Sequence, residues 1–262
     1  DEAGQAIEAA CWIAISRADR VILAGDHCQL PPTIKCIEAA RGGLGRTLLE
    51  KVVLHKPETV SLLKIQYRMH EDIMRFPSRW FYHDELEAAP EVKYRGILDF
   101  DTPVSWIDTS ELDLQEKAVA EGTGRLNTGE AELLVRELKN YMERIGIRRI
   151  LEEHIDFGVI SPYRAQVHYL RHLLKKEPFF RPCRRLITVH TVDGFQGQER
   201  DVIMISLVRA NEKGQIGFLR DLRRMNVAIT RARMKLLILG EAVTLTRHPF
   251  YSELYEYIGG LR

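Results

Sequence analysis

Short β-rich runs alternate with segments of helical apolar spacing along this chain, and that alternation constrains the fold more than any other feature. In 129–145 and 166–174 the apolar residues recur every three or four positions, as on one face of a helix. Strands that alternate with helices are typical of a mostly parallel sheet covered by helices. The sequence therefore predicts an α/β fold with a parallel-sheet core and flanking helices. The predicted strands are 20–25, 61–65, 104–107, 157–160, 186–189, 202–207 and 236–239.

Capping residues and composition refine this outline. Thr128 is the expected N-cap of the helix at 129–145, and Gly146 is its expected stop. Two further helices are predicted, at 5–16 and 44–53. The stretch 108–127 is polar, contains glycine and has no period, so we expect a mobile surface loop there.

The first part of the chain is too small to fold alone. Residues 1–57 supply a helix, a strand and a helix, which cannot bury an independent core. We expect 1–57 to be the C-terminal tail of an incomplete domain, and 58–262 to form a second, complete domain. A phosphate-binding loop of the form G-x-x-x-x-G-K-[ST] is absent. The segment 42–47 is only faintly similar to it, because Arg46 stands where the pattern needs lysine.

Composition indicates an ordinary globular protein, with 45% hydrophobic and 29% charged residues. The longest apolar runs have the length of strands, so no membrane span and no membrane partner are expected. The four cysteines show no C-x-x-C spacing, which favours a reducing compartment, cytoplasmic (or nuclear in a eukaryote). A metal site built from His27, Cys28 and Cys36 would lack a fourth ligand in the sequence.

The net charge of +1 does not by itself indicate a nucleic-acid partner, but the basic residues are unevenly distributed along the sequence. Clusters of basic residues are usually a solvated face, and this reading stays open for both clusters of this chain. They comprise Arg220, Arg223, Arg224, Arg231, Arg233 and Lys235, and separately Arg181, Arg184 and Arg185.

Several polar motifs follow predicted strands, at the sheet edge where open α/β folds bind ligands. In chain order they are D-E-A-G-Q (1–5), G-D-H-C-Q-L-P-P (25–32), Q-Y-R-M-H (66–70), V-D-G-F-Q-G-Q-E (192–199) and N-V-A-I-T-R-A-R (226–233). Together, in this order, they closely resemble superfamily 1B helicases of the up-frameshift and immunoglobulin-mu-binding-protein type. The resemblance covers nearly the whole chain.

This resemblance implies a RecA-like P-loop NTPase fold, with a partial first RecA domain and a complete second one. It also implies an ATP-dependent helicase or translocase that uses ATP and Mg²⁺. Movement on single-stranded DNA or RNA would run 5′→3′. The missing N-terminal half of the polypeptide would then carry the phosphate loop, so that residues 1–262 alone would be inactive.

The resemblance assigns roles to the catalytic motif residues. Asp1 would help to hold Mg²⁺, and Glu2 would act as general base on the attacking water. Gln29 would sense the γ-phosphate or position that water, unless it only stabilises a turn. Arg68 and Arg231 would be arginine fingers that reach ATP across an interdomain cleft. A guanidinium binds phosphate in bidentate fashion, which lysine cannot do.

Nucleotide and nucleic-acid contacts are implied in the same way. Tyr67 would stack on adenine, Gly197 would allow close backbone approach, and Glu199 would contact the ribose or phosphate side. A core tyrosine and a surface salt bridge are the alternatives for Tyr67 and Glu199. Residues expected to face the nucleic-acid strand are Pro31, Ser161, Tyr163, Arg164, His190 and Thr191, with plain loop structure as the alternative.

Two other functions remain open from the sequence. One is a RecA-like module that grips nucleic acid without hydrolysing ATP. The other is the ATPase motor of a protein fused to a nuclease, although this chain shows no nuclease constellation.

Overall fold

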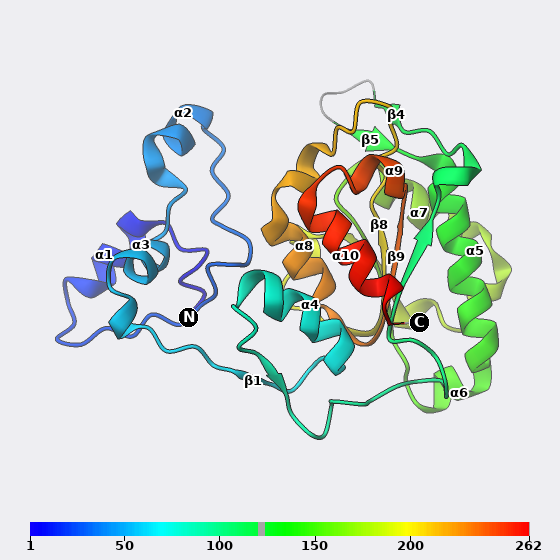
Figure 1. Cartoon of the computed structure of the whole chain (residues 1–262), viewed down its shortest axis with the longest axis horizontal. Coiled ribbons are helices and arrows are strands. Elements are labelled where there is room, and N and C mark those ends of the chain that lie inside the picture. The colour runs from blue at the N-terminus through cyan, green and yellow to red at the C-terminus, as the bar shows by residue number, and fades with distance from the viewer. Residues whose placement is uncertain (120–123, 262) are drawn as a thin grey trace. The chain divides into compact units, whose positions relative to one another are not determined.

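Two compact units divide the chain, Asp1–Leu63 and Lys64–Arg262 (Figure 1). The computed structural model describes residues 1–119 and 124–261. The boundary predicted between residues 57 and 58 lies shortly before the observed division, within the short 3-10 helix η2 (Pro57–Thr59).

A five-stranded sheet in the order β3-β9-β8-β6-β7 forms the centre of the second unit. All neighbouring strands run parallel. The predicted α/β architecture with a parallel sheet is therefore confirmed. The five strands lie where the sequence predicts them, at β3 (Val104–Asp108), β6 (Phe157–Ser161), β7 (Ile187–Thr191), β8 (Arg200–Ser206) and β9 (Ala232–Gly240).

Helices cover both faces of this sheet (Figure 1). On one face α5 (Thr128–Ile145) and α7 (Arg164–Lys176) pack together, and on the other lie α4 (Glu71–Phe81), α8 (Leu222–Ile229) and α10 (Pro249–Gly259). In α5, Leu134, Leu138 and Met142 are fully buried at i, i+4 and i+8. Such a stripe faces the sheet and supplies the hydrophobic core.

The ends of α5 correct one prediction. The N-cap is Asn127, whose side chain accepts a hydrogen bond from the backbone N–H of Glu130 at 3.0 Å, and not Thr128. Asn127 has extended backbone geometry, as an N-cap requires, while Thr128 is already helical. Gly146 ends the helix with φ +89°, as predicted.

The strand predicted at 61–65 is wrong in extent. Only β1 (Ile65–Gln66) forms, and it pairs with β2 (Glu87–Ala88) outside the main sheet. Leu62 and Leu63 are exposed, so the burial that would place an apolar run in the core is missing.

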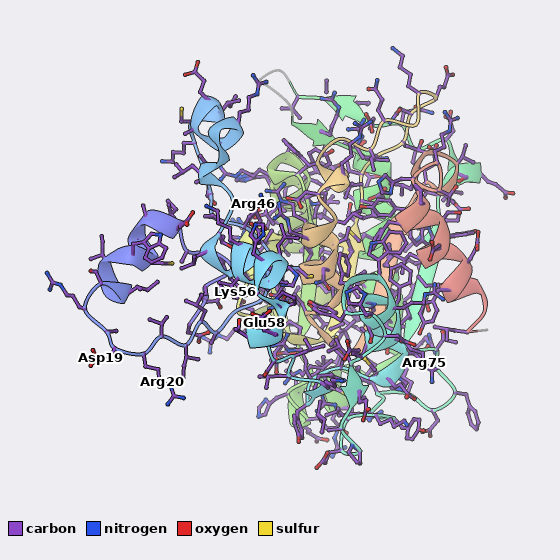
Figure 2. The ribbon with its side chains drawn as sticks, turned by 60° about the vertical axis from the view of Figure 1, so that its left-hand side comes forward. Asp19, Arg20, Arg46, Lys56, Glu58 and Arg75 are labelled. Atoms are coloured by element: carbon purple, nitrogen blue, oxygen red, sulfur yellow. The ribbon has the colours of Figure 1, made fainter. Side chains whose placement is uncertain are left out.

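The strand predicted at 20–25 does not form either. Residues 1–63 are all described, and none of them lies in a strand. Val21 and Ile22 are exposed, and the neighbouring Asp19 and Arg20 point away from the rest of the first unit (Figure 2). Instead of the hydrogen-bond ladder of a paired strand, this segment has a backbone hydrogen bond from Ala3 N–H to the carbonyl of Ala24.

The predicted surface loop at 108–127 contains regular structure. η3 (Ser110–Leu112) is followed by β4 (Lys117–Ala118), which pairs antiparallel with β5 (Arg125–Leu126). Glu116 is nearly buried and lies 2.6 Å from Nε of Arg209. The predicted mobile surface loop therefore contains short regular elements and one anchored carboxylate, whereas residues 120–123 of the prediction lie outside the described residues.

The other helices are short. They are α1 (Glu8–Ile15), α2 (Ile37–Ala39), the π-helix η1 (Ala40–Leu44), α3 (Leu48–His55), α6 (Ile147–Glu152), η4 (Pro178–Phe180), η5 (Arg184–Leu186), η6 (Asp193–Phe195), η7 (Gly217–Arg220) and α9 (Ala242–Leu245). Within residues 1–119 and 124–261, no helix has both the length and the apolar composition needed to cross a bilayer.

Candidate functional site

In the first unit, two of the motifs pack backbone against backbone. A Cβ on Gly25 would lie 2.8 Å from the backbone nitrogens of Ala3 and Gly4. A Cβ on Gly4 would lie 2.4 Å from the carbonyl oxygen of Asp26. Both positions therefore require glycine, and the two glycines bring the segment 1–5 against the loop 25–32.

The acidic pair of this unit is exposed. Asp1 Oδ1 accepts a hydrogen bond from the backbone N–H of Glu2 at 2.8 Å. The carboxylate of Glu2 accepts one from the side-chain amide of Gln5 at 2.6 Å, and the backbone of Glu2 has φ +56°. Exposed carboxylate oxygens are the ligands that Mg²⁺ prefers, so this pair fits a hard cation.

Gln29 is positioned by an aspartate in the same loop. Its side-chain amide donates to Asp26 Oδ2 at 2.8 Å, while Asp26 Oδ1 accepts from the backbone N–H of Cys28 at 2.9 Å. Asp26, His27 and Cys28 also bring one ligand atom each within 4.8 Å of one another. The exposed Cys36, imagined as a ligand from the sequence, is not part of this group.

In the second unit, Gln66 builds the turn that carries the Q-Y-R-M-H motif. Its Oε1 accepts hydrogen bonds from the backbone N–H groups of Arg68 (2.9 Å) and Met69 (2.7 Å), and its Nε2 donates to the carbonyl of Met69 at 2.8 Å. The turn leaves the side chain of Tyr67 67% exposed. Tyr67 is therefore not a core tyrosine, and its ring is accessible for stacking.

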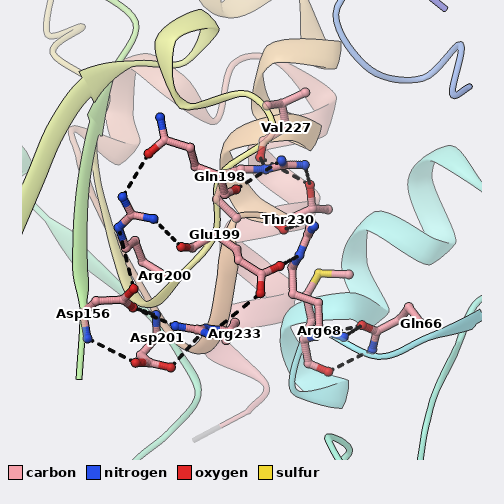
Figure 3. Close-up of polar contacts among 12 residues, drawn as sticks. Gln66, Arg68, Asp156, Gln198, Glu199, Arg200, Asp201, Val227, Thr230 and Arg233 are labelled. Carbon is pink, nitrogen blue, oxygen red and sulfur yellow. Dashed lines mark hydrogen bonds and ion pairs between the residues drawn. The ribbon is translucent and has the colours of Figure 1, made fainter. Parts of the chain in front are cut away.

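Arg68 reaches two distant parts of the unit (Figure 3). Its Nε pairs with the carboxylate of Glu199, and its Nη1 donates to the carbonyl of Thr230 at 3.0 Å. The salt bridge that was the alternative for Glu199 is thus present in this structure. Both side chains remain about one-third exposed or more, at 34% for Arg68 and 40% for Glu199.

Arg233 stands in a separate acidic setting next to this pair (Figure 3). Its Nη2 donates to Asp156 at 2.9 Å, and its Nε lies 3.1 Å from Asp201 Oδ1, a distance for an ion pair without the alignment of a hydrogen bond. Glu199 lies farther away, at 3.8 Å. Burial raises the pKa of Asp201, and Arg233 opposes this shift. The shortest contacts of Arg233 are thus with Asp156 and Asp201.

Arg231 is buried, with 3% of its surface exposed. Its guanidinium donates from Nε to the carbonyl of Val227 (3.0 Å), from Nη1 to that of Gln198 (3.2 Å) and from Nη2 to Thr230 Oγ1 (3.4 Å). Arg68 and Arg231 therefore both bond to Thr230, and Figure 3 shows the contact between Thr230 and Arg68. The fold brings together three motifs that lie far apart in the sequence.

Two glycines in the V-D-G-F-Q-G-Q-E loop are required for different reasons. Gly197 has φ +74°, with open space where a Cβ would stand. Gly194 is crowded instead, since a Cβ there would lie 1.8 Å from Nδ1 of His190. Gly194 N–H also donates to Thr191 Oγ1 at 3.3 Å. Both glycines shape the loop that leads from β7 to Glu199.

The residues expected to face nucleic acid differ in their exposure. Ser161 and Tyr163 are buried, and the Tyr163 hydroxyl accepts a hydrogen bond from Arg209 at 3.3 Å. Their burial runs against the expectation that both side chains face a strand. Arg164 at the start of α7 is exposed, while Pro31, His190 and Thr191 are half-buried.

Comparisons with known proteins show the family of this chain. One family profile, described as "AAA domain", matches residues 44–243, and a second with the same description matches residues 1–36. The chain belongs to the superfamily 1 helicases of this AAA-domain group. Helicases of the up-frameshift type are among its relatives, as the resemblance implied.

The relatives match across almost the whole chain. "DNA-binding protein SMUBP-2" of Rattus norvegicus is 37% identical over 98% of this chain and 26% of its own length. The "Uncharacterized ATP-dependent helicase MJ0104" of Methanocaldococcus jannaschii is 37% identical over 98% of this chain and 37% of its own length. The "Regulator of nonsense transcripts 1 homolog" of Drosophila melanogaster is 35% identical over 98% of this chain and 22% of its own length. This chain thus spans only 22–37% of the length of these relatives.

Among solved structures, the PRRSV helicase aligns over 85% of this chain and 30% of its own, with a TM-score of 0.38 and 16% identity. That similarity is too low to add to the argument from sheet topology.

Some residues of this candidate site were given no role from the sequence. Gln66 supports the turn of Tyr67 and Arg68, and Asp156 and Asp201 hold Arg233. The sequence could have indicated the role of Gln66, because this residue is the first of the Q-Y-R-M-H motif. Asp156 and Asp201 carried no motif signal, because only the parallel pairing of β6 with β8 brings them together.

Proposed function

We propose that this chain is the C-terminal portion of an ATP-dependent helicase or translocase that moves on single-stranded nucleic acid. The observation that carries the proposal is the convergence of Arg68 and Arg231 on Thr230, beside the Gly197–Glu199 segment. Guanidinium groups gathered at one place suit a transferring phosphoryl group, whose charge they stabilise.

Each unit would then supply a different part of the reaction. In the first unit, Asp1 holds Mg²⁺, Glu2 takes the proton of the attacking water, and Gln29 orients that water. Mg²⁺ neutralises charge on the phosphate oxygens when it is bound. In the second unit, Arg68 and Arg231 act as arginine fingers on ATP. The buried Arg231 then has to exchange one of its bonds to Val227, Gln198 or Thr230 for a bond to phosphate.

The nucleotide would also be held by the second unit. The exposed ring of Tyr67 stacks on the adenine. Gly197 admits the nucleotide close to the backbone, and Glu199 binds it on the ribose or phosphate side. Since Glu199 pairs with Arg68 in the structure, we propose that Arg68 leaves this carboxylate when it contacts phosphate.

For the nucleic-acid strand, we propose direct contacts from Pro31, Arg164, His190 and Thr191. The buried Ser161 and Tyr163 are proposed to support the strand-binding loops from beneath. A motor that steps along any sequence needs contacts mainly to phosphate and sugar.

The decisive experiment compares Arg231→Ala with Arg233→Ala in a longer protein that includes a phosphate-binding loop. Loss of an arginine finger lowers kcat by about 10³-fold or more. We expect this loss for Arg231→Ala, with nucleic-acid affinity changed by less than about threefold. Arg233→Ala, which removes a structural ion pair, is the matched control and should leave kcat within about tenfold. Weakened nucleic-acid binding with normal turnover in Arg231→Ala would reject the finger role.

The acidic pair has its own test in the longer protein. Glu2→Gln should abolish hydrolysis while ATP binding is retained, since an amide keeps the size of the side chain but cannot accept a proton. Equal loss of ATP binding would argue against a general base. Residues 1–262 alone should show no ATP turnover, because the sequence contains no phosphate-binding loop.

Direction and substrate need a separate measurement. We propose 5′→3′ movement on DNA or RNA, in the cytoplasm or nucleus. Partial duplexes with a 5′ or a 3′ single-stranded tail, each made in DNA and in RNA, distinguish the cases. Unwinding only from the 3′ tail would overturn the proposed direction without affecting the ATPase assignment.

A further inference from the structure

A cavity of about 490 Å³ lies beside β7, the edge strand of the sheet, and neither Arg68 nor Arg231 lines it. Its floor is apolar, and its walls come from α7, η4, η5 and β7. Apolar side chains that contribute to it are Leu174, Phe180, Ile187 and Val189. A pocket with this lining favours an apolar side chain over a charged one.

Exposed cations surround this cavity. Arg171, Lys175 and Arg184 line its rim, and Lys176, Arg181 and Arg185 follow next to them in the sequence. Among the described residues, none of these six side chains lies within ion-pair distance of a carboxylate, although carboxylates pair with cations at many other places on the molecule. Positive charge left uncompensated at one place, in a chain whose net charge is only +1, attracts a polyanion.

The cavity rim is held in place by backbone contacts. Arg184 Nη2 donates to the carbonyl of Lys175 at 3.2 Å, which joins η5 to the end of α7. Arg171 donates from Nε (3.1 Å) and Nη2 (2.7 Å) to the carbonyl of Val189 in β7. Fixed cations lose less conformational entropy when a ligand binds.

The same contact of Arg171 argues against one mode of binding. A peptide that extends a sheet must bond to the free backbone groups of the edge strand. In β7 the outward carbonyl of Val189 already accepts both bonds from Arg171. This contact opposes strand addition at Val189, so we expect a ligand at this position to be recognised through side chains.

Single-stranded nucleic acid fits this place less well than a peptide. Its bases bind to exposed aromatic rings on which they stack. Two aromatic rings line the cavity. Phe180 is only 1% exposed, and the half-buried His190 has Gly194 packed against its ring, so neither offers an open ring face. Aliphatic groups from the floor and cations from the rim instead match an acidic segment with aliphatic anchors.

We propose that the cavity beside β7 is a docking site for an acidic peptide segment of a partner protein. An aliphatic side chain of that segment enters the cavity, and flanking Asp or Glu residues pair with Lys175, Arg184 and Arg171. None of the residues that line this site is proposed to contact ATP, while His190 is shared with the proposed nucleic-acid contacts.

Fluorescence anisotropy with residues 1–262 tests the proposal. The probe is a labelled peptide of about 12 residues in which Asp and Glu surround two leucines. We expect saturable binding with a Kd below about 100 µM at about 50 mM salt. Lys175→Glu combined with Arg184→Glu should weaken binding at least tenfold, and the difference should shrink at about 300 mM salt.

Three controls make the outcome decisive. Lys213→Glu with Arg136→Glu reverses two exposed charges elsewhere and should leave the affinity unchanged. A peptide with both leucines replaced by serine should bind at least fivefold more weakly, because it cannot fill the cavity. Thermal unfolding checks that the double variants remain folded.

Several results would overturn the proposal. The first is that the peptide does not bind, and the second is that the leucine and serine peptides bind equally well. The third is that both charge-reversed double variants lose the same amount of peptide affinity. Tighter binding of a labelled oligothymidine of similar length, weakened only by Lys175→Glu with Arg184→Glu, would assign the cluster to nucleic acid instead.

Discussion

The two units of this chain use similar residues with different results. In Asp1–Leu63 the apolar side chains Trp12, Ile13 and Ile22 are more than half exposed, and no strand forms. In the second unit, residues of the same kinds fill a core between five strands and the helices on both faces. The difference shows that an apolar run becomes a strand only where a neighbouring strand completes its hydrogen bonds.

The motifs of the first unit depend on close backbone packing in place of a core. Gly4 and Gly25 allow the segment 1–5 to lie against the loop 25–32, while α1 has no buried residue. The second unit holds its motifs by buried side chains such as Arg231. Mutations should therefore separate the two units by the size of their effects.

The largest expected effect is a cavity in the core of the second unit. Leu138→Ala removes a fully buried side chain of α5 and should lower the free energy of unfolding by about 2–5 kcal/mol. Ile13→Ala in the first unit removes a side chain that is 69% exposed. This substitution should change the free energy of unfolding by less than about 0.5 kcal/mol. Urea unfolding followed by circular dichroism measures both. Equal losses of unfolding free energy for both variants would mean that the difference in burial between the two units does not produce a difference in stability.

A smaller effect concerns a buried carboxylate at the first turn of α5. Glu130 is fully buried and accepts hydrogen bonds from the Ser206 hydroxyl (2.5 Å) and the backbone N–H of Val208 (2.9 Å). Val208 has φ +71°, which is strained for a β-branched residue. Glu130 thus fixes a strained turn at the end of β8.

Burial raises the pKa of Glu130 from 4.5 to about 7. The folded state therefore binds this proton more tightly than the unfolded state. Between about pH 4.5 and pH 7 the folded state carries more protons, so the free energy of unfolding falls as pH rises through this window. The expected decrease is about 3 kcal/mol at most.

Glu130→Gln removes this titration. Unfolding measured from pH 4.5 to pH 8 should show a shallower decrease in stability for the variant than for the original chain. The difference between the two pH profiles is the quantity to compare, since the amide also changes stability at every pH. Two parallel profiles would show that Glu130 does not titrate in this window.

The smallest expected effect lies in the first unit, at the start of α3. Thr47 and Glu50 form a capping box, with Glu50 N–H donating to Thr47 Oγ1 at 3.1 Å and Thr47 N–H donating to Glu50 Oε2 at 2.9 Å. Thr47→Ala should destabilise α3 by about 1 kcal/mol. Hydrogen exchange of the α3 amides measures this local change, and Thr59→Ala, at an exposed residue, is the control. Unchanged exchange in α3 would mean that other contacts hold the helix.

The sequence by itself determined the fold class and the motif inventory. Helical stripes such as that of α5 and β-rich runs such as 202–207 follow from local periodicity, which does not depend on distant contacts. The same holds for Gly146 as a helix stop, because only its own φ matters. Periodicity failed at 20–25 and 61–65, where the pattern was right but no partner strand or burial accompanied it.

Only the tertiary structure decided which charged residues belong together. Arg231 and Arg233 are two positions apart, yet one is buried among backbone carbonyls and the other pairs with Asp156 and Asp201. The pairing of Arg68 with Glu199 joins residues 131 positions apart. A side chain's partner depends on which strands lie next to each other, and that order is set by the packing of the whole sheet.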